Sequence, residues 1–194
     1  MSNVAQISKP SATDQLAGIK IVDADTHVTE AYDLWTSRAP AKYRDRVPQV
    51  KEIDGKPTWV IEGDRLMGVN HASSTVLKSG EKVCGTGFFE LELADVHAAC
   101  YDVNERVALM DQMGIAAQIA YPNVLGFAGQ RAFDIDPELR LVCGQIYNDA
   151  MIEMQRDSGE RIFPMALLPW WDAKLAVAEI ERCAAMGMRG VNTN

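Results

Sequence analysis

Several features that would indicate a particular class of protein are missing from this sequence. Its four cysteines, Cys84, Cys100, Cys143 and Cys183, are scattered and include no C-x-x-C pair. This arrangement disfavours a disulfide framework and a cysteine-rich zinc module. Three of the four fall within apolar helical patterns, so we expect buried, reduced thiols.

Positive charge and long apolar runs are also scarce. The 19 lysines and arginines are outnumbered by 27 acidic residues and form no basic run, which disfavours a nucleic-acid groove. No segment has the about 20 apolar residues that a membrane-spanning helix needs. Residues 1–18 lack the apolar core of a signal peptide, and their polar composition predicts a disordered N-terminal tail. We expect a soluble, cytoplasmic protein that binds neither nucleic acid nor a membrane.

The chain does contain enough apolar material for a substantial core, since 47% of its 194 residues are hydrophobic. Short runs with the composition of buried strands alternate with helical patterns. The predicted strands lie near residues 19–23, 115–121, 162–168 and 189–193.

Three amphipathic helices are predicted between these strands. The first ends at Gly114, a residue suited to the left-handed position after a helix. Asp136 and Pro137 mark the start of the second, and Asp172 caps the third. Apolar residues recur at spacings of three and four, which predicts the core-facing side of each helix. These residues are Val96, Cys100, Val103, Val107 and Met110, then Leu139, Cys143, Ile146, Ala150 and Met154, and finally Ala173, Val177, Ile180 and Ala184.

The segment 28–93 interrupts the alternation and is predicted to be an insertion. Two short β-rich runs, 50–53 and 58–61, are joined by the Gly-containing turn 54–57, a pattern typical of a β-hairpin. Residues 63–87 are rich in Gly and Ser and are expected to form a long loop over one face, as functional loops often do.

Strands that alternate with helices form parallel sheets with right-handed crossovers. An eight-stranded β/α barrel typically needs about 250 residues, and this sequence offers four such strands. The predicted fold is therefore α/β. Over residues 19–194 it is the N-terminal half of a TIM-type (β/α)8 barrel, with the hairpin-containing insertion after the first strand.

A candidate metal site lies at the end of the first predicted strand. Asp23, Asp25 and His27 stand at every second position, and alternate residues of a strand point to the same side. Carboxylate oxygens and an imidazole together suit a divalent metal. Aspartates near a strand end are also common as turn and cap residues, so both interpretations stay open on spacing alone.

The motif over residues 21–28, followed by 33–35 and 41–46, resembles the amidohydrolase-related branch of the amidohydrolase superfamily. This branch includes the aminocarboxymuconate-semialdehyde decarboxylase-like enzymes. The likeness extends along the chain through Met113-Gly114-Ile115, Tyr121-Pro122, Leu168-Pro169 and Arg189-Gly190-Val191.

The resemblance implies a metal-dependent β/α barrel with a divalent metal, often zinc, at the C-terminal face of its strands. By match, Asp25 and His27 are the two ligands that the first strand supplies. Asp25 departs from the commoner pattern, because a histidine is usual at its position. The remaining ligands of the family, a histidine after the fifth strand and an aspartate after the eighth, would lie beyond Asn194.

Residues after the strands are the candidates for substrate contact, since catalytic residues of barrels come from the C-terminal ends of strands. Asn123 follows the second strand, and His71 lies in the long loop that could fold over the barrel mouth. Trp170 and Trp171 follow the third strand, and Asn192 belongs to the fourth. His97 falls within a predicted helix and is expected to be structural.

The favoured function is a metal-dependent hydrolase that acts on a small carbonyl or carboxylate compound, here incomplete. One alternative is a non-oxidative, metal-dependent decarboxylase of the same family. A second is an inactive fragment or α/β interaction module, since exposed sheet edges invite self-pairing. We expect a small-molecule substrate, a homo-oligomer for the complete protein, and weak metal binding by this chain alone.

Overall fold

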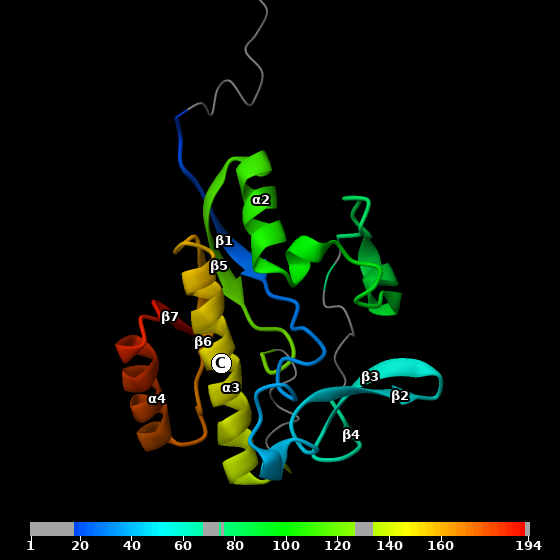
Figure 1. Ribbon diagram of the computed structural model, residues 1–194, viewed down its shortest axis with the longest axis vertical. Helices are drawn as coiled ribbons and strands as arrows, with labels where there is room; N and C mark the ends of the chain where they lie inside the picture. The colour runs from blue at the N-terminus through cyan, green and yellow to red at the C-terminus, as the bar shows by residue number, and fades with distance from the viewer. Residues whose placement is uncertain (1–17, 68–73, 75, 127–133, 193–194) are drawn as a thin grey trace, which may run out of the picture.

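The computed structural model describes residues 18–67, 74, 76–126 and 134–192, arranged as an α/β fold with two sheets (Figure 1). The larger sheet has the strand order β1-β5-β6-β7, and all three of its pairings are parallel. The predicted parallel α/β architecture is confirmed. The predicted disordered tail falls almost entirely on residues outside the described part, and stays a prediction.

The strands of the parallel sheet lie close to their predicted positions, with one difference that matters. β5 spans Ile115–Tyr121 as predicted, and β6 (Ile162–Leu167) and β7 (Gly190–Asn192) are slightly shorter than predicted. β1 spans Ile21–His27, so the prediction that it ends at residue 23 is wrong. Pairing with β5 carries the strand through the polar residues as far as the candidate ligand His27.

Helix α2 (Val103–Met113) begins later than predicted, and the single helical face that includes Val96 and Cys100 is wrong. The Asp102 side chain accepts hydrogen bonds from the N–H groups of Asn104 and Glu105, which fixes the first turn of the helix at Val103. A separate 3-10 turn, η3 (Ala98–Cys100), precedes it. Gly114 ends the helix in the left-handed conformation (φ 71°), as predicted.

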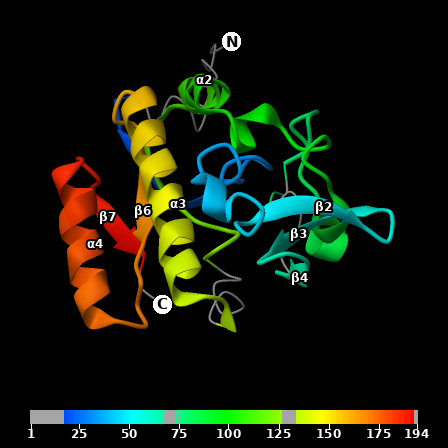
Figure 2. The ribbon, with the colours of Figure 1, turned by 60° about the horizontal axis from the view of Figure 1, so that its bottom comes forward.

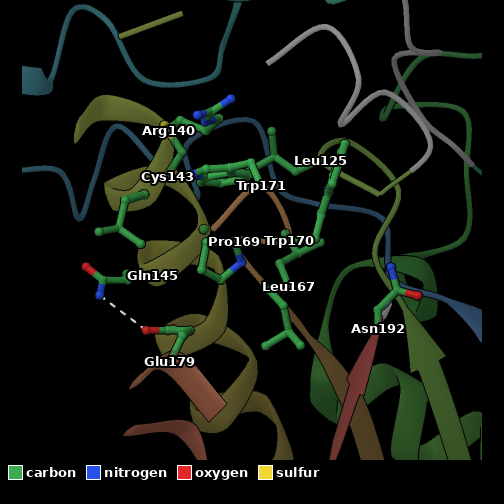
Figure 3. A pocket seen from close by; sticks show the side chains of 13 residues that line it. Leu125, Arg140, Cys143, Gln145, Leu167, Pro169, Trp170, Trp171, Glu179 and Asn192 are labelled. Carbon is green, nitrogen blue, oxygen red and sulfur yellow. Dashed lines mark hydrogen bonds between the residues drawn. The ribbon is translucent and has the colours of Figure 1, made fainter. Parts of the chain in front are cut away.

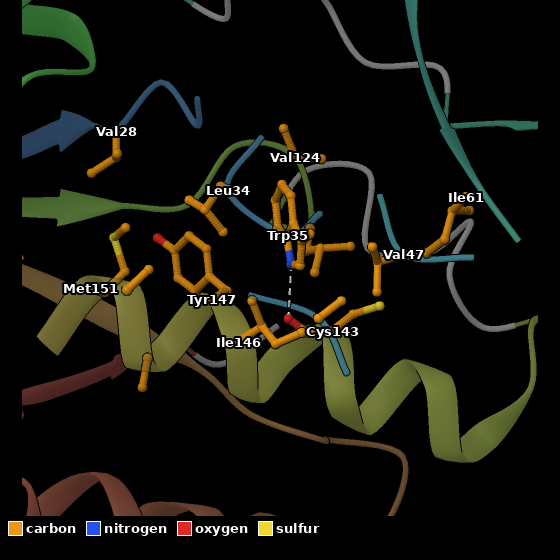
Figure 4. Packing of buried hydrophobic residues seen from close by; sticks show 14 of the residues in the cluster. Val28, Leu34, Trp35, Val47, Ile61, Val124, Cys143, Ile146, Tyr147 and Met151 are labelled. Atoms are coloured by element: carbon orange, nitrogen blue, oxygen red, sulfur yellow. Dashed lines mark hydrogen bonds between the residues drawn. The ribbon is translucent and has the colours of Figure 1, made fainter. Parts of the chain in front are cut away.

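Helix α3 (Pro137–Asp157) confirms its predicted start, because Asp136 accepts hydrogen bonds from the N–H groups of Glu138 and Leu139. Its inner side packs against residues of the insertion (Figure 4). The Trp35 indole donates a hydrogen bond to the Cys143 carbonyl at 2.9 Å and stacks on the Tyr147 ring, with 6.5 Å between centroids. The insertion and the barrel half therefore share one hydrophobic core.

Helix α4 (Ala173–Ala185) lies beside α3 along β6 and β7 (Figure 2), but its predicted core face is wrong. Val177 and Ile180, which belong to that face, are 55% and 39% exposed, and the buried residues are Glu179 and Cys183. The physical reason is a set of hydrogen bonds. Glu179 faces α3 and accepts one from Asn148 at 2.7 Å, so a charged residue occupies the inner side.

The insertion contains a separate antiparallel sheet of β2 (Gln49–Ile53), β3 (Lys56–Ile61) and β4 (Arg65–Leu66). The predicted hairpin is confirmed, with a turn of two residues instead of four. Asp54 (φ 53°) and Gly55 (φ 76°) form this turn, and positive φ at both positions suits the twist of a hairpin. Two 3-10 turns, η1 (Ala41–Tyr43) and η2 (Gly85–Glu90), complete the segment.

All four cysteines are free thiols, as predicted, but their burial differs. Cys143 and Cys183 are buried in helices, Cys100 is half-buried and Cys84 is exposed. Among the helices that the structure describes, none is long and apolar enough to cross a membrane.

Candidate functional site

A bulge near the end of β1 determines which way its polar side chains point. Three residue steps from Asp23 to Thr26 pair with only two steps, from Gln118 to Ala120, on β5. The extra residue reverses the alternation. The Asp23 side chain binds Gln118, which binds Arg106 of α2, whereas the His27 ring lies against Tyr121, so the predicted common face is wrong for Asp23. That Asp25 and His27 share a face stays a prediction.

The helix side of this strand end is held by a chain of hydrogen bonds centred on Arg106 of α2. The Asp23 carboxylate accepts from the Gln118 side-chain amide at 3.1 Å, and Gln118 Oε1 accepts from Arg106 Nε at 2.8 Å. Arg106 also donates to the Thr26 hydroxyl at 2.7 Å and to the His27 carbonyl at 2.9 Å. The guanidinium thus fixes the backbone of His27, and Asp23 is part of this support.

The two predicted metal ligands lie at the C-terminal end of β1. Asp25 is exposed within the bulge, and its N–H donates to the Asp23 carboxylate at 3.2 Å. His27 is half-buried, with its ring centroid 5.9 Å from that of Tyr121. The two residues offer the oxygen and nitrogen donors that zinc accepts, but a catalytic zinc takes three protein ligands. Within the described ranges, no group of three or more His, Cys, Asp or Glu side chains is placed to hold a metal.

Glu30 is a residue that the sequence analysis missed. It lies three positions after His27, is only 1% exposed, and its Oε1 accepts hydrogen bonds from the N–H groups of Asn123 at 2.9 Å and Val124 at 3.0 Å. Burial raises the pKa of the Glu30 carboxyl to about 7, although the two N–H groups act in the opposite direction. A single acid in a polar stretch gives no sequence signal of such burial.

Asn123, predicted to contact substrate, is buried at the junction of β1 and β5. Its side-chain amide donates to the Val28 carbonyl at 2.6 Å, and its N–H donates to Glu30. These bonds connect the two strand ends. Substrate contact by Asn123 stays a prediction, as does that by His71, which lies outside the described residues.

A pocket brings together three of the other predicted substrate contacts, Trp170, Trp171 and Asn192 (Figure 3). The two indoles lie edge to face, with centroids 6.4 Å apart and planes at 67°. The Arg140 guanidinium lies 3.8 Å from the centroid of the Trp171 ring, a favourable cation–π contact at the pocket wall. The rest of the lining is mainly apolar and includes Leu125, Leu167 and Pro169.

The pocket and the candidate ligands share one end of the sheet. Leu125 follows β5, Trp170 follows β6 and Asn192 closes β7. Because all four strands run parallel, these positions and His27 lie at the same, C-terminal edge. This is the edge at which barrel enzymes build their sites.

Comparison by sequence gives no match, either to a family model or to a curated protein. Comparison by structure does. An amidohydrolase from Mycobacterium avium subsp. paratuberculosis K-10 matches with a TM-score of 0.62 and 20% identity, over 87% of this chain and 47% of that one. IDCase from Metarhizium anisopliae matches with a TM-score of 0.52 and 15% identity, over 90% and 42% of the two chains.

A third similar structure is a dihydroxybenzoic acid decarboxylase from Polaromonas sp. JS666, with bound manganese and the inhibitor 2-nitroresorcinol. Its TM-score is 0.50 and its identity 18%, over 90% of this chain and 38% of that one. The chain therefore spans less than half the length of each of these proteins. Over that part, its fold is that of amidohydrolase and related decarboxylase structures, as the resemblance implied.

Proposed function

We propose that the chain supplies part of a metal-dependent active site of amidohydrolase type, which hydrolyses a small carbonyl or carboxylate compound. One observation carries the proposal: Asp25 and His27 lie at the C-terminal end of β1, the same edge of the sheet as the pocket of Trp170, Trp171 and Asn192. The bound manganese of one similar structure supports a divalent metal, and the oxygen and imidazole donors suit zinc.

Each residue has a distinct part in this proposal. Asp25 and His27 would hold the metal, which when bound acts as a Lewis acid and lowers the pKa of a coordinated water. The hydrogen bond from Arg106 to the His27 carbonyl keeps that ligand in place. Trp170 and Trp171 wall the pocket and exclude water from an apolar part of the substrate. Asn192 offers an amide for a polar group.

The second candidate is a metal-dependent, non-oxidative decarboxylase. The paired indoles favour it, because they suit a planar aromatic substrate, and one of the similar structures is a dihydroxybenzoic acid decarboxylase. Arg140, stacked on Trp171, would bind a substrate carboxylate at a wall that also carries the Glu179 carboxylate. Release of carbon dioxide from 2,6-dihydroxybenzoate, against release of a hydrolysis product from a carboxylic ester or amide, separates the two reactions.

Zinc titration of the purified chain by calorimetry, with elemental analysis, tests the shared part of both candidates. We expect Asp25→Ala and His27→Ala each to weaken zinc binding at least about tenfold, since each removes one of the few donors. Asp45→Ala removes another exposed carboxylate, and His97→Asn removes another imidazole but keeps a capping acceptor. These matched controls should bind zinc as the wild type does. Equal binding by all five proteins would favour the interaction module.

A further inference from the structure

The carboxyl of Glu30 joins the ends of β1 and β5. Glu30 follows β1 by three residues, while the N–H groups that its Oε1 accepts belong to Asn123 and Val124, directly beyond β5. One acceptor thus holds two successive N–H groups of the neighbouring loop. Both groups would otherwise be buried without a partner among the described residues, which is costly.

Two further hydrogen bonds connect the same segments, one in each direction. The Asn123 side chain donates to the Val28 carbonyl at 2.6 Å, and the Val28 N–H donates to the Tyr121 carbonyl at 3.0 Å. Val28 directly follows His27, and Tyr121 is the residue whose ring faces the His27 imidazole. The position of the imidazole is therefore set by the junction that Glu30 closes.

Glu30 is buried, and burial makes an acid costly there. Val28, two residues before Glu30, and Val124, whose N–H binds Glu30, are both buried. The Tyr147 hydroxyl points from α3 toward the strand ends (Figure 4). Among the residues placed by the structure, neither Glu30 Oε2 nor the Tyr147 hydroxyl has a hydrogen-bond partner. Burial, and then the nearby Glu30, raise the pKa of Tyr147. Burial of an acid with one oxygen that accepts no hydrogen bond from the described residues is costly.

We propose that Glu30 is a positioning residue for the candidate metal site, which sets His27 against the end of β5 through the two N–H groups that its Oε1 accepts. The inference rests on the proposed function, because a site must exist for Glu30 to position it. Glutamine in the same place keeps an acceptor at Oε1 and should maintain the junction. Leucine, of similar size, offers no acceptor. Aspartate is one methylene shorter and withdraws the oxygen from the loop.

Two measurements on Glu30→Gln, Glu30→Leu and Glu30→Asp test this role: the zinc dissociation constant, and amide hydrogen exchange at Asn123 and Val124. We expect Glu30→Leu to weaken zinc binding about tenfold or more, as loss of outer supports of metal ligands does, and to accelerate exchange at both amides. Glu30→Gln should stay within about threefold of the wild type in zinc affinity. Glu62→Gln is the matched control, since Glu62 also accepts a backbone N–H, that of Asp136 at 3.4 Å.

Zinc affinity that is unchanged in Glu30→Leu, or equally weak in Glu30→Gln and Glu30→Leu, overturns the inference. If Glu30→Leu does not fold, the test uses Glu30→Asp. We expect this variant to bind zinc more weakly and to exchange both amides faster, with an unchanged circular dichroism spectrum. If the wild type binds no zinc, or binds it without Asp25 and His27, the proposed function fails and this inference with it. Unchanged zinc binding in the Glu30 variants, with Asp25 and His27 required, overturns only the present inference.

Discussion

Two buried glutamates in different regions of the molecule have opposite electrostatic properties. Glu30, at the junction of β1 and β5, is 1% exposed, and burial raises its pKa to about 7. Glu179 lies between α3 and α4 and is 3% exposed. Burial raises the pKa of Glu179, but hydrogen bonds from Arg182, Asn148 and Gln145 outweigh it and leave the pKa below its ordinary value.

The difference shows that partners, and not depth alone, determine the charge of a buried acid. Glu179 has a guanidinium partner in Arg182 at 2.7 Å, which favours the ionised form. Glu30 has two backbone N–H groups and no counter-ion within the described structure, so the neutral form persists toward neutral pH. The interface between α3 and α4 is thus built around the ionised carboxylate of Glu179, whereas the Glu30 carboxyl at the strand ends keeps its proton up to near-neutral pH.

Truncation of a large aromatic side chain in the core that α3 and the insertion share should have the largest effect. Trp35→Ala opens a cavity against Tyr147 and Trp59 and deletes the bond to the Cys143 carbonyl, so we expect a loss of about 3–5 kcal/mol in the free energy of unfolding. Urea denaturation measures it. Trp170→Ala is the matched control, because Trp170 is 48% exposed and should cost well under half as much. Equal losses would mean that α3 and the insertion do not share a core.

The pH dependence of stability should separate the two acids. Between the ordinary pKa of 4.5 and the folded pKa of about 7, the folded chain retains a proton on Glu30 that the unfolded chain has released. The free energy of unfolding therefore falls as pH rises through this window, by on the order of 3 kcal/mol in total. Glu179 acts in the opposite sense, with its contribution lost as pH falls below its ordinary pKa.

Urea denaturation of the wild type and Glu30→Gln at pH 5 and pH 8 measures the Glu30 contribution. Glutamine does not titrate, so the fall in stability between the two pH values should be smaller in the variant. The same fall in both proteins would show that the Glu30 carboxyl is already ionised at pH 5.

Loss of the charge between the helices should have the next largest effect. Glu179→Ala leaves Arg182 and the Asn148 amide without their shared acceptor, and we expect about 2 kcal/mol of destabilisation. Glu179→Gln keeps an acceptor for Asn148 and should cost less. Thermal unfolding followed by circular dichroism gives both values. A variant with leucine at position 179 that is more stable than the alanine variant and equal to the wild type would show that the charge is dispensable.

The outer side of α4 should give the smallest effect. Val177→Glu and Ile180→Glu replace exposed apolar side chains, so each should change the free energy of unfolding by about 0.5 kcal/mol or less. Ile146→Ala on α3 is a buried counterpart, expected to cost about 2–4 kcal/mol. Sedimentation velocity should also show less self-association in the double variant, because exposed apolar surface promotes it. Unfolding of the double variant would mean that this side of α4 is covered.

Features with local causes were predictable from the sequence. The start of α3 depends on Asp136 and Pro137, the end of α2 on Gly114, and the hairpin turn on Asp54 and Gly55, and each operates within a few residues. The grouping of pocket residues followed from a parallel sheet, in which strand ends share one edge.

Features that depend on contacts distant in sequence were not predictable. The inner side of α4 is set by a hydrogen bond from Asn148, 31 residues away from Glu179, which a periodicity of apolar residues cannot reveal. The burial of Glu30 depends on Asn123, 93 residues away. The sides of the sheet to which the β1 side chains point depend on a bulge in the pairing of β1 with β5. In the candidate site, residue types were therefore easier to identify than the directions in which they point.

Because of the bulge in β1, the side of the sheet on which the His27 imidazole lies depends on the number of residues between Asp23 and Thr26. With Asp23 bound to Gln118, His27 faces Tyr121 because β1 has one more residue between Asp23 and Thr26 than β5 has between Gln118 and Ala120. A variant that lacks Ala24 would restore strict alternation and turn either the histidine toward the helices or Asp23 away from Gln118. A related chain that keeps every polar residue but has one position fewer in this stretch could not both bind Gln118 through Asp23 and place the imidazole on the side of Tyr121.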